Sequence, residues 1–211
     1  RFGRFQDAED GVRFLEYREL ELPTNTFQEG VLGGPMRDPN GFAELVGNLL
    51  GEISVPVPEA SLVVPDRWLR TSFVEVGEMP KDLEAQEEVL RWKLKRLVPF
   101  RIEDLRVRGT EVEPLPNQEE PVRVLLGYGI EKLLAQLETA FTTAGVQIGL
   151  LTNRSLSLLA GMAETFADDN ISVLAVVRPD AYTLTFAQGV SPIGSIRCLS
   201  TRSAIWVAFR E

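Results

Sequence analysis

The 211-residue chain contains no histidine and only one cysteine, Cys198. Without imidazole it can form neither a histidine-based catalytic triad nor a histidine metal site, and it lacks the commonest general base. A single thiol cannot form an intramolecular disulfide or a multi-cysteine metal site. We therefore expect no metal, a half-buried place for Cys198 in a strand, and a reducing compartment.

Long apolar runs and a basic excess are missing as well. No run approaches the roughly 18 to 20 residues that cross a bilayer, and the opening RFGRFQDAED is too polar for a signal peptide. The sequence therefore predicts a cytoplasmic protein with no direct membrane insertion. The net charge of -9 predicts no nucleic-acid partner, because affinity for a polyanion comes mainly from lysine and arginine.

The composition is that of a globular chain of one or two domains, with 44% hydrophobic residues. Strands are predicted over Arg1–Phe5, Val12–Leu22, Ala60–Pro65, Leu69–Val76, Leu105–Val112, Val122–Tyr128, Val146–Leu151, Ile171–Val177, Ala181–Ala187, Ser195–Arg197 and Ala204–Phe209. Helices are predicted to begin at Asp38, Asp82, Ile130 and Asn153. Interleaved strands and helices favour a mixed α/β architecture with a central sheet covered on both sides.

The helix that begins at Asp82 has apolar residues on two sides. One stripe, expected to face the core, consists of Leu83, Leu90, Leu94 and Leu97. The opposite strip consists of Ala85, Val89 and Trp92, flanked by Arg96. This second strip either packs against another part of the chain or forms the wall of a groove for a partner segment.

The segment Glu87–Leu105 reads EEVLRWKLKRLVPFRIEDL. Its tryptophan, its Pro-Phe pair and the acidic turn that follows resemble a segment of PilM-type proteins, the actin-like cytoplasmic components of type IV pilus assembly machines. Type II secretion relatives such as GspL share this segment. Arg70–Pro80 is also similar to a stretch of these proteins, although Gly77 and Glu78 stand where they usually have leucine and proline. The resemblance follows nearly the whole chain in order, through short motifs.

This resemblance implies an actin-like ATPase or ribonuclease H-like core with a small inserted α+β domain, as in the cell-division protein FtsA. On this basis residues 1–65 form a first core subdomain without its N-terminal strands, and 66–128 form the inserted domain. Residues 129–170 contribute helices that return to the first subdomain, and 171–211 begin a second, incomplete core subdomain. Either the family has a shortened member here or residues are absent from the sequence.

Actin-like folds hold ATP between two glycine-containing phosphate hairpins. Where the resemblance places the second hairpin, this chain reads Arg178-Pro179-Asp180, and proline lacks the backbone N–H that a phosphate would accept. We therefore expect no enzymatic activity and no cofactor. Arg178 is the candidate for contacting a phosphate should ATP and Mg²⁺ bind.

The function implied is that of a non-catalytic scaffold, which lies at the inner membrane through its protein partners. It would dock the cytoplasmic tail of a PilN-like bitopic membrane protein and contact other pilus or secretion platform components. The partner-binding residues are predicted to be Val89, Trp92, Arg96, Pro99 and Phe100. Two alternatives stay open, an ATP-binding actin-like switch and a self-associating structural subunit. The sequence does not separate pilus biogenesis from type II secretion or competence.

Overall fold

A computed structural model describes residues 1–8, 11–53, 56–112, 121–162, 165, 170–178, 181–189 and 191–199. The strands are β1 (Phe2–Ala8), β2 (Gly11–Arg18), β3 (Glu59–Val64), β4 (Arg70–Val76), β5 (Leu105–Glu111), β6 (Val122–Ile130), β7 (Gln147–Asn153), β8 (Ile171–Val177), β9 (Ala181–Gln188) and β10 (Ser191–Leu199). The helices are α1 (Pro39–Gly51), α2 (Leu83–Lys95), the short 3-10 helix η1 (Ile102–Asp104), α3 (Glu131–Thr143) and α4 (Arg154–Gly161). The predicted order of strands and helices is confirmed as far as Leu199, and the predicted strand Ala204–Phe209 lies outside the described residues.

The chain divides into two compact units. The first comprises Arg1–Leu62 and Ile130–Leu151, and the second comprises Val63–Gly129 and everything from Thr152 onward. Strands β3 and β7 form a two-stranded sheet of their own, and the division between the units falls within both strands. The four-segment organisation expected from the resemblance stays a prediction.

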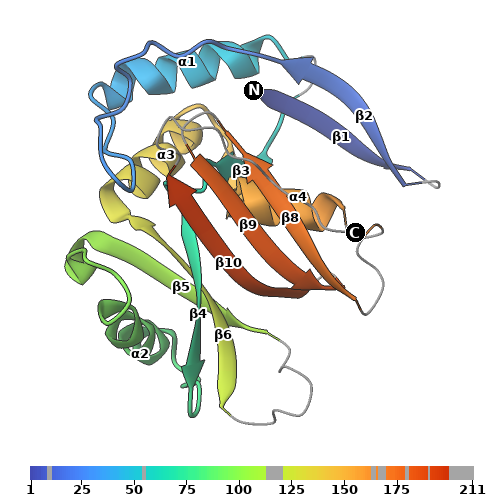
Figure 1. Ribbon diagram of the computed structural model, residues 1–211. Coiled ribbons are helices and arrows are strands. Elements are labelled where there is room, and N and C mark those ends of the chain that lie inside the picture. Colours follow the sequence, from blue (N-terminus) through green and yellow to red (C-terminus); the bar gives the residue numbers. More distant parts are fainter. Residues whose placement is uncertain are drawn as a thin grey trace. The chain divides into compact units, whose positions relative to one another are not determined.

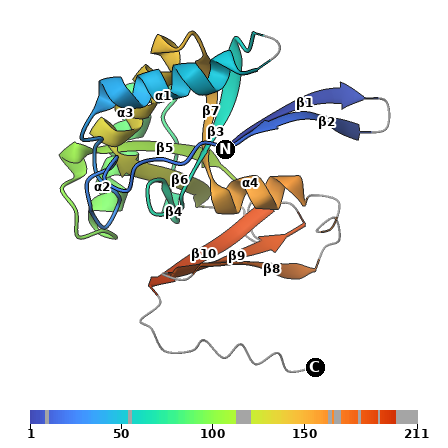
Figure 2. The same ribbon diagram turned by 90° about the horizontal axis from the view of Figure 1, so that it is seen from above.

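Two helices, α1 and α3, pack side by side in the first unit (Figures 1 and 2). The side chain of Asp38 caps α1 by accepting a 2.9 Å hydrogen bond from the backbone N–H of Gly41. After α3, Gly145 adopts a φ of +84°, which favours glycine and ends the helix. The same unit holds the antiparallel hairpin of β1 and β2, where Phe5 and Phe14 pack edge to face.

The second unit contains a three-stranded sheet with strand order β4-β6-β5, against which α2 packs. Leu90 and Leu94 of α2 are buried there. Gly109 of β5 permits close packing, because a Cβ at this position would lie 2.8 Å from Leu90 Cδ1 and 2.8 Å from Val124 Cγ1. The close contact between α2 and the sheet therefore requires a glycine at this position of β5.

A second antiparallel sheet of this unit has the order β10-β9-β8 (Figure 1). Leu159 of α4 packs against its residues Ala187 and Leu174. Arg123 of β6 connects the two sheets, since its guanidinium donates a hydrogen bond to the carbonyl of Ile193. Within the described ranges no helix is both long and apolar enough to cross a bilayer.

The leucine stripe predicted for α2 is only half buried. Leu90 and Leu94 face the sheet as expected, whereas the side chains of Leu83 and Leu97 are 77% and 55% exposed. Leu83 belongs to the first turn, and the helix ends at Lys95, so Leu97 no longer follows the helical arc on which the prediction depended. The expectation that all four leucines line the core is therefore wrong for its two outer members.

Candidate functional site

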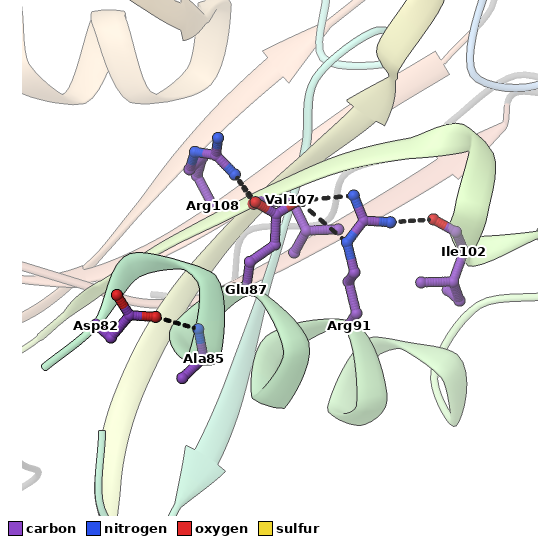
Figure 3. Close-up of polar contacts among 7 residues, drawn as sticks. All are labelled: Asp82, Ala85, Glu87, Arg91, Ile102, Val107 and Arg108. Carbon is purple, nitrogen blue, oxygen red and sulfur yellow. Dashed lines mark hydrogen bonds and ion pairs between the residues drawn. The ribbon is translucent and has the colours of Figure 1, made fainter. Parts of the chain in front are cut away.

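Helix α2 carries the residues that the sequence singles out. Its N-cap, Asp82, accepts a 3.0 Å hydrogen bond through Oδ2 from the backbone N–H of Ala85 (Figure 3). Glu84 lies in its first turn and Lys93 and Lys95 in its last, an arrangement that complements the helix dipole. Both ends of the helix are therefore stabilised locally.

A network of charged groups fixes how α2 is rotated against the sheet (Figure 3). Glu87 Oε1 accepts hydrogen bonds from Nε and Nη2 of Arg91, at 3.1 and 2.6 Å, and Glu87 Oε2 accepts one from Arg108 of β5. Arg91 Nη1 also donates to the carbonyl of Ile102 in η1, at 2.8 Å. These hydrogen bonds, led by those from Arg91, lower the pKa of Glu87.

This rotation turns the opposite strip of α2 away from the sheet. At about 100° per residue, Trp92 lies roughly opposite Leu90 and Leu94, and Val89 lies on the flank between the two sides. Trp92 is accordingly 58% exposed. Ala85 and Val89 of this strip are half-buried, so of its three residues only Trp92 is exposed. The use of the strip as the wall of a partner groove stays a prediction.

A shallow depression of about 390 Å³ lies beside this strip, and we call it the Trp92 depression. Its residues come from the end of β4, the connection that follows it, and α2: Val76, Gly77, Glu78, Glu88, Val89, Trp92 and Lys93. The ammonium of Lys93 lies 5.6 Å from the centroid of the Trp92 ring, within the range of a cation–π contact. The depression thus combines an apolar floor with charges of both signs.

The structure brings together two of the five residues predicted to bind a partner. Val89 and Trp92 line the depression. Arg96 is the exposed C-cap of α2, and Pro99 is exposed beyond it. Phe100 is partly buried, and its ring centroid lies 5.8 Å from Cζ of Arg70. Arg96, Pro99 and Phe100 do not line the depression, and the contacts of all five with a partner stay predictions.

Sequence reasoning missed the wall formed by the end of β4. Val76 and Glu78 precede α2 in the chain and reach Trp92 only through the turn between strand and helix. One signal was available, because Gly77 and Glu78 are the two positions where this stretch departs from the pattern that it resembles. Helical periodicity could also have placed Glu88 and Lys93 beside Val89 and Trp92.

Arg178 lies elsewhere in the second unit, at the end of β8. It is exposed and lines a small polar pocket of about 40 Å³ together with Asp66, Arg67, Thr183 and Arg197. An adjoining pocket of about 200 Å³ is lined by Asp66, Arg70, Thr71, Ser72, Tyr128, Asn153, Thr183, Ser195 and Arg197. Pro179 and Asp180 are outside the described residues, so phosphate contact by Arg178 stays a prediction.

A wider groove of about 890 Å³ follows the seam between α1 and α3 in the first unit. Small and polar residues form most of its lining, for example Ala43, Gly47, Ala135 and Thr139, and no aromatic residue contributes. Buried aromatic and arginine anchors dominate the energy of most protein interfaces. The Trp92 depression is therefore the stronger candidate for a partner site.

Comparison with known proteins shows which solved structures have a similar fold. No protein-family profile matches the sequence, and no curated protein matches it. The structure is similar to the PilM–PilN type IV pilus biogenesis complex, with a TM-score of 0.75 and 18% identity over 92% of this chain and 56% of that chain. It is also similar to the cytoplasmic domain of EpsL, an inner-membrane component of the type II secretion system of Vibrio cholerae, with a TM-score of 0.50, 10% identity, and coverage of 92% of this chain and 63% of that chain.

These similarities confirm, at the level of the fold, the resemblance first noted around Trp92. The fold class is mixed α/β, as predicted, and the fold is like that of the PilM–PilN complex. The chain spans somewhat more than half the length of either structure that it matches.

Proposed function

We propose that this chain is an assembly component of a type IV pilus or a related type II secretion machine, and that it docks the cytoplasmic tail of a PilN-like membrane protein. The similarity to PilM in its complex with PilN supports this role. Binding to such a tail would hold the protein at the inner membrane through its partner. The role proposed is that of a scaffold without catalytic activity, an inference supported by the proline at position 179.

The observation that carries the proposal is the exposure of Trp92 on a helix that is otherwise fixed. Glu87, Arg91 and the buried leucines hold α2 in place, so the tryptophan is presented on a rigid surface. Covering the exposed half of an indole removes roughly 100 Å² of apolar surface from water, which is about 2 to 3 kcal/mol at 25 cal/mol per Å². A rigid aromatic side chain also loses little entropy when it is covered.

The proposal is tested by isothermal titration of the protein with a synthetic peptide. The peptide has the sequence of the cytoplasmic tail of the bitopic membrane protein encoded beside this chain. We expect saturable one-to-one binding that Trp92→Ala weakens by about tenfold or more, since 1.4 kcal/mol is a factor of ten. Leu83→Ala is the matched control, because Leu83 is an exposed apolar residue of the same helix that does not line the depression.

The same titration with Mg-ATP separates the scaffold from the alternatives. Binding that is unaffected by ATP supports a scaffold, and binding that requires ATP supports a nucleotide-dependent switch. If the Trp92→Ala variant is folded by circular dichroism and binds the peptide with the same affinity as the unchanged protein, the Trp92 depression is not the binding site.

A further inference from the structure

Two glutamates face the Trp92 depression without partners. Glu78 stands after β4 and Glu88 stands on α2, so they belong to different walls. Within the part of the chain that the structure describes, neither carboxylate takes part in an ion pair or a side-chain hydrogen bond, and both residues are exposed. Glu87 differs from its neighbour Glu88, because two arginines hold its carboxylate. The two walls of the depression therefore each present a carboxylate that is not held by an arginine.

The floor between the two glutamates is apolar and aromatic. Val76 is fully buried, Val89 is half-buried, and Trp92 is 58% exposed. Lys93 places an ammonium 5.6 Å from the ring centroid, a geometry in which an indole attracts a cation. Long basic side chains combine an apolar stem with a charged head, and such a side chain suits an apolar floor with acidic walls.

We infer that the Trp92 depression recognises a basic side chain, preferably arginine, of the segment that docks there. The alkyl stem lies along Val89 and Trp92, and the guanidinium lies between the carboxylates of Glu78 and Glu88. Arginine is favoured over lysine because its planar, weakly hydrated head stacks on an indole and donates to two carboxylates at once. This inference rests on the proposed function and adds the chemistry by which the tail is selected.

Charge complementarity beyond the depression supports this occupant. The chain as a whole carries a net charge of -9. The acidic walls lie toward the N-terminal half of α2, whereas Lys95, Arg96 and Arg101 lie at or beyond its C-terminal end. A basic residue is therefore attracted to the depression, and an acidic residue further along the same segment would be attracted to the end of the helix.

The test uses the same tail peptide and the full chain, with binding followed by titration calorimetry and by the indole N–H signal of Trp92 in ¹H–¹⁵N spectra. Trp92→Phe assigns that signal. We expect Glu78→Gln with Glu88→Gln to weaken binding by about tenfold and to reduce its dependence on salt. Glu84→Gln, which removes an exposed carboxylate from the same helix outside the depression, should change the affinity less than twofold.

A charge exchange identifies the residue that is recognised. Each arginine or lysine of the peptide is replaced in turn by glutamate, and the variant that loses binding should regain it with Glu88→Arg protein. If Trp92→Ala abolishes binding while the double glutamine variant binds like the unchanged protein, the recognition of a basic side chain is wrong and the docking function stands. If a tail without lysine or arginine binds at the depression, the inference is also overturned. If the tail does not bind the folded protein at all, the docking function itself is wrong.

Discussion

The backbone N–H of Ser155 donates a 2.9 Å hydrogen bond to Oδ1 of Asp66, a residue 89 positions earlier in the chain. Asp66 lies in the turn after β3 and Ser155 lies in the first turn of α4, and both are buried. Asn153 adds a second connection, since its Nδ2 donates to the carbonyl of Leu69 at 3.0 Å. A carboxylate at a helix N-terminus satisfies a free N–H group and is favoured by the helix dipole.

We expect Asp66→Ala to lower the free energy of unfolding by about 1 to 3 kcal/mol, because it leaves a buried N–H without an acceptor. Hydrogen exchange at the Ser155 amide is the local measurement and urea unfolding the global one. Asp66→Asn keeps an acceptor and should cost less. An unchanged exchange rate at Ser155 in Asp66→Ala would contradict the role of this hydrogen bond.

The pKa of Glu87 predicts an acid-sensitive contribution to stability. Its pKa is lowered from an ordinary value of 4.5, first by the hydrogen bonds from Arg91. A carboxylate with a lowered pKa in the folded state contributes stability that is complete above the unfolded pKa and is lost as the pH falls through the folded pKa. We therefore expect Glu87→Gln to be less stable than the unchanged protein at pH 7, by about 1 kcal/mol.

The measurement is urea unfolding between pH 7 and pH 3. Glu88→Gln is the control, because Glu88 is an exposed residue of the same helix that lies outside its first turn and forms no ion pair in the described part of the chain. The difference between Glu87→Gln and the unchanged protein should shrink as the pH falls below about 4.5. A constant difference across this range would show that the charge of Glu87 is not what stabilises the contact of α2 with β5.

The position of Gly109 predicts that a larger residue there destabilises the protein. A methyl group there would come within 2.8 Å of both Leu90 and Val124, so Gly109→Ala should destabilise the protein by about 1 to 3 kcal/mol. Gly47→Ala is the matched control, because nothing lies within 4 Å of the added Cβ in α1. Alanine has the higher helix propensity, so this control should stabilise by about 0.5 to 1 kcal/mol. Thermal unfolding of the two variants should therefore shift in opposite directions.

Much of the fold could be predicted from the sequence because its signals are local. Asp38, Asp82 and Asn153 all act as the N-caps that their residue types indicate, and Gly145 ends its helix at positive φ. The pair Glu87 and Arg91 has the helical i, i+4 spacing, so a reader of the sequence could expect their contact. The motif around Trp92 gave the fold by resemblance.

The candidate site was harder to predict because its walls come from separate segments. Nothing local places Glu78 opposite Glu88, or Arg108 on Glu87, since each pairing depends on how α2 packs on the sheet. The same packing separates Val89 and Trp92 from Phe100, which lies under Arg70 instead. Tertiary structure determines which groups lie opposite one side of a helix, and the periodicity of the sequence carries no information about it.

The divided leucine stripe of α2 gives the last prediction. Leu94 is fully buried whereas Leu97 is 55% exposed, although the sequence places both on one arc. We expect Leu94→Ala to cost about 2 to 5 kcal/mol, because it removes buried methyl groups and leaves a cavity, and Leu97→Ala to cost less than about 0.5 kcal/mol. Urea unfolding measures the loss of stability in each variant, and the two variants carry the same substitution at positions three residues apart. Equal losses of stability would mean that the helix continues beyond Lys95 and carries Leu97 into the core. Arg96 would then not be the C-cap at which the helix ends before Pro99.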